Sequence, residues 1–198
     1  INVKMDTGEL RPLDGERLHK VIAESVEGLA GVDAQQVTQA AMRNLYDGIS
    51  EREVATALII STRVLIDHDP NYSLVAARML MDSLRREVLS FLEGQHTEAT
   101  QAEMGGLYTD ALRKAIKCGI EVHLLDDELS RYDLARLGAA IKPERDLQFT
   151  YIGLQTLYDR YFLHSNGTRF ELPQVFFMRV AMGLAINEVD RETRAIEF

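Results

Sequence analysis

The last quarter of the chain constrains the fold most strongly. Residues 150–163 and 173–187 carry apolar side chains at helical spacing, and a short polar segment separates them. Within that segment, Asn166-Gly167 is a dipeptide that accepts positive φ at both central positions of a hairpin turn. Pro173 stands where a helix begins, because the first helical turn does not need its missing N–H. The sequence therefore predicts two helices joined by a small hairpin at residues 165–169.

Size and charge narrow the class of protein. A chain of 198 residues with 46% apolar residues has room for one or two packed domains. No apolar run reaches the ~18 residues of a membrane span, and the N-terminus lacks a signal-peptide core, so we expect a soluble cytoplasmic protein without a membrane partner. The net charge of −9 argues against nucleic acid as a partner, because phosphate binding needs clustered cations.

The first half is predicted to begin with a hairpin and to continue as helices. Val3 and Met5 alternate with polar neighbours, and Asp6-Thr7-Gly8 supplies the turn. Four helical stretches follow, of which the first ends at Gly31, the second at about Leu45, and the fourth covers residues 72–91. Capping or stop signals stand at Asp14, at Asp33 with Gln36, at Ser50 with Glu53, and at Asp69-Pro70. Residues 1–92 are thus predicted to form a four-helix bundle with a small β-hairpin lid.

The second half is predicted to be a separate all-helical unit. Residues 93–106 are polar, contain glycine and show no periodicity, which is typical of a linker. Residues 107–198 then contain helical patterns at about 108–117, 128–141, 150–163 and 173–187, and Asp190 caps the start of another helix. The expected fold class is mainly α, in two helical domains that each carry one short hairpin.

The first unit resembles a known regulatory module. The segments Val3 to Gly8, Pro12 to Leu18 and Tyr46 to Ile49 are similar to the ATP cone, the domain through which ATP activates and dATP inhibits many ribonucleotide reductases. In such a fold the hairpin lid brings cations near a helix N-terminus, whose N–H groups and dipole favour phosphate. The resemblance implies ATP or dATP as an effector, with Lys4, Asp14, Arg17 and Arg86 as its binding residues.

Other positions depart from the cone pattern. The lid pair Lys-Arg of the family is Lys4-Met5 here. Glu51 and Ala55 stand where the family has a threonine and a histidine, and Asp82 replaces an aromatic residue near the base. A carboxylate that faces a triphosphate costs several kcal/mol in a site built for anions. We therefore expect an intact cone fold with an impaired nucleotide site.

The second unit resembles the helical N-terminal domain of the large subunit of class I ribonucleoside-diphosphate reductases. The matching positions are Gly119, residues 123–126, residues 146–151 and the helix from Pro173 to Asn187. The resemblance implies a parent enzyme that makes deoxyribonucleotides for DNA synthesis and whose catalytic cysteines and carboxylate lie beyond Phe198. It also implies, as partners, the catalytic barrel in the remainder of the large subunit, a radical-generating small subunit and further copies of the chain.

Two alternative functions lie outside the enzyme class. A transcriptional repressor of reductase genes joins a cone to a zinc ribbon, but one cysteine and five histidines without i, i+4 pairing do not supply a zinc site. A helical interaction module without ligand stays open and agrees with the altered cone positions. Cys118 at a helix end and Asp6-Thr7-Gly8 are interpreted as packing and turn residues, so no catalytic residue and no metal site is predicted.

Overall fold

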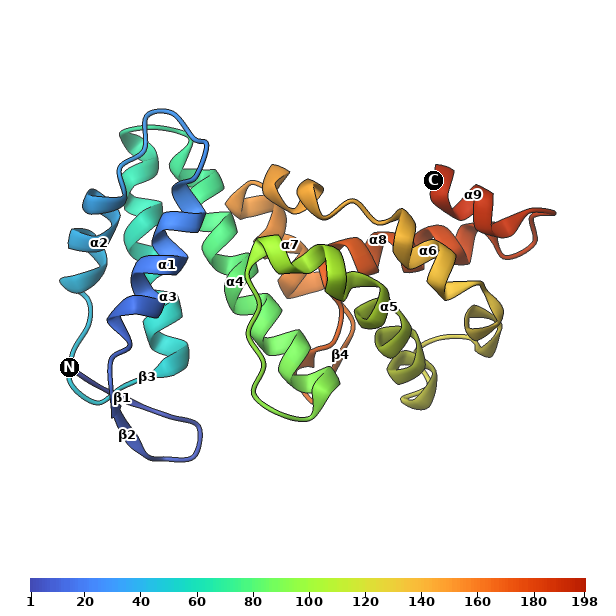
Figure 1. Cartoon of the computed structure of the whole chain (residues 1–198), viewed down its shortest axis with the longest axis horizontal. Coiled ribbons are helices and arrows are strands. Elements are labelled where there is room, and N and C mark those ends of the chain that lie inside the picture. The colour runs from blue at the N-terminus through green and yellow to red at the C-terminus, as the bar shows by residue number, and fades with distance from the viewer. The chain divides into compact units, whose positions relative to one another are not determined.

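The computed structural model describes residues 1–198 and is mainly α-helical, with two small β-sheets (Figure 1). The chain divides into two compact units. Unit 1 contains Ile1–Ser83 and Leu147–Gln155, and unit 2 contains Leu84–Asp146 and Thr156–Phe198. The mainly α fold class is confirmed. The predicted domain limits of 1–92 and 107–198 stay a prediction, because the division into units falls within helix α4 (Tyr72–Glu93) and helix α7 (Tyr151–Arg160).

A three-stranded sheet opens unit 1. Strands β1 (Asn2–Lys4) and β2 (Leu10–Pro12) pair antiparallel, as the sequence predicts, and Gly8 adopts a φ of +84° in the turn between them. Strand β3 (Ile49–Ser50) lies parallel to β1, with Val3 opposite Ile49. This third strand was not predicted, because two residues are too few to show an alternating pattern. Val3, Ile49 and Leu45 form a small core beneath the sheet.

The helices of unit 1 begin largely where their caps predict. They are α1 (Gly15–Val26), α2 (Ala34–Met42), α3 (Glu51–Val64), the 3-10 turn η1 (Leu65–Asp67) and the part of α4 that ends at Ser83. The reciprocal capping box of Ser50 and Glu53 is confirmed. The box predicted for Asp33 and Gln36 is wrong, because the Asp33 carboxylate accepts from the backbone N–H of Gln35 instead.

Two helix ends differ from the prediction. Helix α1 ends at Val26 rather than at Gly31, because Gly28, just past the C-cap residue Glu27, adopts a φ of +71°. Arg78 on α4 donates to the carbonyl oxygens of Glu27 at 2.8 Å and Ser25 at 3.3 Å at this helix end. Gly31 has a different role. Its φ is +75°, and a Cβ atom there would lie 2.1 Å from an Asp69 carboxylate oxygen, so only glycine fits this turn. Helix α2 ends at Met42, short of Leu45.

Unit 2 contains the rest of the helices. They are the 3-10 turn η2 (Gln101–Glu103), α5 (Met104–Glu121), η3 (Asp127–Arg131), α6 (Leu134–Ala140), most of η4 (Pro143–Gln148), the second half of α7, α8 (Pro173–Ala185) and α9 (Arg191–Glu197). Helix α5 contacts α6 and α8, and α8 contacts α9. The hairpin of β4 (His164–Ser165) and β5 (Thr168–Arg169) is confirmed, with Asn166 and Gly167 both at positive φ.

Two expectations for unit 2 were wrong. The predicted helix 128–141 is interrupted after η3, because the Tyr132 hydroxyl donates to the carbonyl of Met182 at 2.6 Å and Asp133 caps the new helix α6. Helix α5 starts at Met104, inside the predicted linker 93–106. The Met104 side chain is fully buried, and this burial outweighs the low helix propensity of the two glycines that follow it. No helix of the chain has both the length and the apolar character that crossing a membrane requires.

Candidate functional site

Lys4 lies at the end of the lid hairpin. Its side chain is exposed, and its backbone pairs with Leu10 on one side and with Ser50 on the other. Ser50 is the N-cap of helix α3. The parallel pairing of β1 with β3 therefore places the lid lysine beside the positive end of a helix, as the phosphate-binding hypothesis requires.

That helix end already carries its own anions. The Glu53 carboxylate accepts from the hydroxyl of Ser50 at 2.6 Å and from its backbone N–H at 2.9 Å. The hydroxyl bond, followed by the backbone bond, lowers the pKa of Glu53, so this side chain stays ionised. Glu51 adds a second carboxylate to the same first turn. The N-terminus of α3 is consequently compensated from within the helix, which disfavours an added phosphate.

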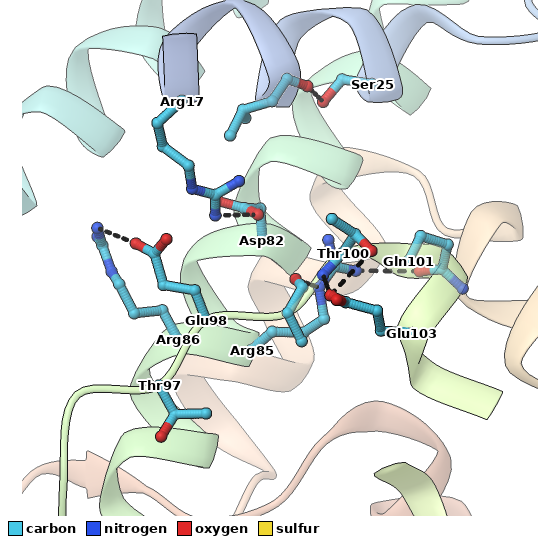
Figure 2. Close-up of polar contacts among 12 residues, drawn as sticks. Arg17, Ser25, Asp82, Arg85, Arg86, Thr97, Glu98, Thr100, Gln101 and Glu103 are labelled. Carbon is cyan, nitrogen blue, oxygen red and sulfur yellow. Dashed lines mark hydrogen bonds and ion pairs between the residues drawn. The ribbon is translucent and has the colours of Figure 1, made fainter. Parts of the chain in front are cut away.

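Arg17 and Asp82 form an ion pair within unit 1 (Figure 2). Arg17 lies in the first turn of α1 and Asp82 lies on α4, and the guanidinium Nη2 is 2.7 Å from the carboxylate Oδ1. The two side chains are 22% and 15% exposed, so the pair is partly withdrawn from water. The structure thus joins a cation predicted to hold phosphate to one of the carboxylates predicted to impair the site.

Asp14 has a structural contact at the same helix. Its carboxylate Oδ1 accepts from the backbone N–H of Arg17 at 2.9 Å and so caps α1. This carboxylate stands at the helix end where the cone hypothesis requires free N–H groups for phosphate. The capping role predicted for Asp14 is confirmed, and its role in nucleotide binding stays a prediction.

Arg86, the fourth predicted residue, belongs to unit 2. Its guanidinium is 4.0 Å from a carboxylate oxygen of Glu98 (Figure 2). The His96 ring nitrogen Nε2 lies 3.6 Å from that same oxygen. Lys4, Asp14 and Arg17 therefore share one unit, whereas Arg86 contacts an acidic residue of the other. The ion pair of Arg86 was not predicted, because Glu98 lies in the polar segment interpreted as a linker.

A buried polar centre in unit 2 was missed by sequence reasoning. The Tyr108 hydroxyl donates to Asp146 at 2.5 Å, the Gln174 amide donates to the same carboxylate at 3.1 Å, and Asp146 is 3% exposed. Burial raises the pKa of Asp146, while the bonds from Tyr108 and Gln174 act in the opposite direction. Burial raises the pKa of Tyr108 well above its usual value. No sequence signal identifies this centre, because its partners come from two distant helices.

Arg85 forms a second polar centre of unit 2. Its guanidinium donates to the side chain of Gln101 at 3.0 Å (Figure 2). It also donates to the carbonyl of Ala99 at 3.0 Å, and the Gln101 amide donates to the carbonyl of Pro143 at 2.7 Å. Arg85 is 4% exposed. These bonds connect the segment between α4 and α5 to the Arg85 side chain and to the carbonyl of Pro143.

The chain offers little nucleophilic chemistry. Cys118 is its one cysteine, and burial, followed by the charge of Glu121, raises the pKa of the thiol. A raised pKa disfavours the thiolate, which is the reactive form. This environment agrees with the interpretation of Cys118 as a packing residue.

Comparison with known proteins adds independent information. Residues 147–198 match the family described as "Ribonucleotide reductase, all-alpha domain". The chain is 43% identical over 167 residues to the ribonucleoside-diphosphate reductase subunit alpha of Chlamydia trachomatis serovar D, covering 84% of the chain and 15% of that relative. It is 34% identical over 200 residues to the subunit alpha of Helicobacter pylori strain 26695, covering 100% of the chain and 24% of the relative. With the ribonucleoside-diphosphate reductase 1 subunit alpha of Escherichia coli K12 it shares 28% identity over 191 residues, which cover 94% of the chain and 23% of the relative. The chain therefore spans less than a quarter of the length of these relatives.

Proposed function

Since this chain is related to the large subunits of ribonucleoside-diphosphate reductases, we propose that it is the regulatory and structural N-terminal part of such a subunit. The parent protein would reduce ribonucleoside diphosphates and so supply deoxyribonucleotides for DNA synthesis. Within this role, unit 1 is an ATP cone whose nucleotide site is impaired. The ion pair of Arg17 and Asp82 is the observation that carries this proposal.

The physical reason is competition for one guanidinium. A nucleotide phosphate that binds Arg17 must displace the Asp82 carboxylate, which already holds the guanidinium at 2.7 Å. The displaced carboxylate would then lie close to the triphosphate and repel it, and the partly buried position weakens screening by water. Glu51 and Glu53 add to this repulsion at the N-terminus of α3. Loss of two or three contacts worth roughly 1.5–3 kcal/mol each weakens a micromolar site to the millimolar range.

The test is to restore the family pattern. Glu51→Thr, Ala55→His and Asp82→Phe, introduced together, should recover ATP and dATP binding with a micromolar Kd in a calorimetric titration. Asp82→Ala alone should recover part of the affinity, because it removes the carboxylate that competes with phosphate for Arg17. The matched control is Asp67→Ala, which removes an exposed carboxylate from the same unit and should leave binding unchanged. A folded triple variant that does not bind nucleotide would contradict the proposal of a degenerate cone.

We also propose that this segment contributes no catalytic residue. The chain alone should give no deoxynucleotide from CDP when it is mixed with a radical-generating small subunit and a thiol reductant. The raised pKa of Cys118 supports this expectation. Product formation that disappears in Cys118→Ser would contradict it.

A docking role is the second candidate, and the outer face of α8 favours it. Phe177, Val180 and Leu184 follow one another at spacings of three and four residues, so they share one face of the helix. They are 49%, 39% and 68% exposed. We propose that the remainder of the large subunit covers this apolar face, with the small subunit and further copies of the subunit as partners of the parent.

This docking role has its own test in the full-length parent protein. Leu184→Asp should increase hydrogen exchange along α8, because a charge would open the proposed contact. Val189→Asp is the matched control, since Val189 is fully exposed in the turn after α8 and lies outside the stripe. Equal exchange of α8 in the two variants would exclude this face as the contact.

A further inference from the structure

Three glycines of the chain directly follow an aspartate or an asparagine. The dipeptides are Asp14-Gly15, Asp47-Gly48 and Asn166-Gly167. Glycine has no side chain to shield its backbone nitrogen, so this nitrogen can reach the side-chain carbonyl carbon of the residue before it. A bond between these two atoms closes a five-membered ring. The structure decides at which of the three dipeptides the two atoms are free to meet.

The two aspartate dipeptides, both in unit 1, are restrained. Asp14 Oδ1 accepts from the backbone N–H of Arg17 at 2.9 Å. Asp47 Oδ1 accepts from the backbone N–H and the side-chain amide of Asn2 at 2.7 and 3.0 Å. The backbone N–H of Gly48 donates to the carbonyl of Asn2 at 2.8 Å, so this nitrogen is also engaged. A nitrogen attacks an ionised carboxylate less readily than an amide, which disfavours ring closure further.

Asn166-Gly167, in unit 2, differs on each of these points. Both residues are exposed, and neither the Asn166 side chain nor the Gly167 backbone N–H has a hydrogen-bond partner. The space around Gly167 is open, because a Cβ atom there would have nothing within 4 Å. The nucleophilic nitrogen and the amide carbon are therefore unhindered.

The base of this hairpin is fixed, whereas its tip can adjust. The backbone N–H of Arg169 donates to the Glu87 carboxylate at 2.8 Å, and its guanidinium carbon lies 4.0 Å from the centre of the Tyr158 ring. At the tip, the Arg169 guanidinium Nη1 donates to the carbonyl of Gly167 at 3.1 Å and leaves the Gly167 nitrogen free. Ring closure requires rotation about the Cα–C bond of Asn166. This rotation disturbs the exposed turn and leaves the packed base in place.

We propose that Asn166 is a modification site at which the chain changes its own covalent structure. The backbone nitrogen of Gly167 bonds to Cγ of Asn166 and loses its proton. The side-chain nitrogen of Asn166 takes up a proton and leaves as ammonia, so the product is a cyclic imide. Water then adds to either imide carbonyl and opens the ring. One opening gives aspartate, and the other gives isoaspartate, in which the main chain runs through Cβ and Cγ.

Both products alter the hairpin. Each adds a negative charge beside the turn carbonyl to which the Arg169 guanidinium is bound. Isoaspartate also adds a carbon atom to the main chain of a two-residue turn, whose geometry fits the strand pairing only at its ordinary length. The pairing of Ser165 with Thr168 therefore shifts in the modified chain. The modification does not involve nucleotide binding, so its test is independent of the proposed function.

Ageing of the whole 198-residue chain at constant pH and temperature, followed by a short trypsin digestion and mass spectrometry, tests the proposal. Residues 161–169 form one tryptic peptide, in which Asn166 is the only asparagine. The fraction of this peptide that carries the mass gain of an amide-to-acid conversion should rise with time. The product should separate into two chromatographic forms, aspartate and isoaspartate.

Asn187 is the matched control within the same chain. It is exposed and lies in unit 2, but Glu188 follows it, and a side chain at that position shields the attacking nitrogen. Its peptide should convert at least roughly ten-fold more slowly than the 161–169 peptide. Equal rates for the two peptides would overturn the proposal, because Asn166 would then have no special reactivity.

Asn166→Gln tests whether the signal comes from this side chain. Glutamine must close a six-membered ring, which forms more slowly, so the 161–169 peptide of the variant should stay unmodified over the same period. The same mass gain in this variant would contradict the assignment to Asn166. Conversion of the wild-type peptide to aspartate without isoaspartate would contradict the cyclic imide, because water would then attack the amide directly.

Discussion

Removal of the Glu171 carboxylate is expected to lower the stability of the folded state more than most single substitutions in unit 2. Glu171 is 1% exposed, and its carboxylate accepts from Arg179 Nε at 2.5 Å, from Arg179 Nη2 at 3.0 Å and from the backbone N–H of Leu163 at 2.8 Å. Glu171→Ala leaves a largely buried guanidinium and an amide without this acceptor. Breaking a buried pair by removing one partner costs about 3–5 kcal/mol.

Urea unfolding, followed by far-UV circular dichroism, measures this loss. With a typical slope of about 2 kcal/mol per molar urea, the unfolding midpoint should fall by about 1.5–2.5 M. Glu171→Gln keeps an oxygen that can accept from the backbone N–H of Leu163. Its unfolding midpoint should therefore lie between those of Glu171→Ala and the wild type. The matched control is Glu188→Ala, because its exposed pair with Arg194, at 3.6 Å, is worth about 0–1 kcal/mol. A Glu171→Ala variant within about 1 kcal/mol of the wild type would refute the argument from burial.

Three further predictions concern α5 and the residues packed against it. Gly138→Ala should lower the free energy of unfolding by about 1–3 kcal/mol, because the added Cβ would lie 2.7 Å from the backbone of Thr109. Gly105→Ala, which lies in open space on α5, should raise the free energy of unfolding by up to about 1 kcal/mol, and equal urea midpoints for the two variants would contradict this contrast. Burial raises the pKa of Asp146, so the folded state holds the carboxyl proton more tightly than the unfolded state does. The free energy of unfolding of the wild type should therefore fall relative to that of Asp146→Asn as the pH rises above about 4. Parallel curves of stability against pH for the two proteins would exclude this linkage. Tyr108→Phe removes a hydrogen bond that lowers the pKa of Asp146. The carboxyl carbon resonance of Asp146 in an NMR titration should therefore change at higher pH in this variant than in the wild type. An unshifted titration would count against the hydrogen bond.

Local signals in the sequence identified most of the elements. Asp14, Ser50 and Asp190 each accept from the backbone N–H three residues ahead, so the starts of their helices were predictable. The hairpin at Asn166-Gly167 was predictable as well, because both residues readily adopt the positive φ that its turn requires, without a distant partner. Predictions succeeded where the stabilising contact lies within one turn of the chain.

Contacts between distant residues account for the errors. The pairing of β3 with β1 brings together Val3 and Ile49, which are 46 positions apart in the sequence. The two residues Ile49 and Ser50 alone carry no strand pattern. The break before α6 depends on Tyr132 reaching Met182, 50 residues away. In the candidate site, the sequence identified Arg17 and Asp82 separately, but their ion pair across 65 residues needed the structure.

The most direct test of the account is a calorimetric titration of the unmodified chain with dATP, with and without Mg²⁺. The competition between Asp82 and phosphate for Arg17, together with the acidic first turn of α3, predicts no saturable heat below about 1 mM. The folded state of the chain can be verified in the same sample from its helical circular dichroism. One-to-one binding of dATP with a micromolar Kd would contradict the central claim and would restore an intact allosteric cone.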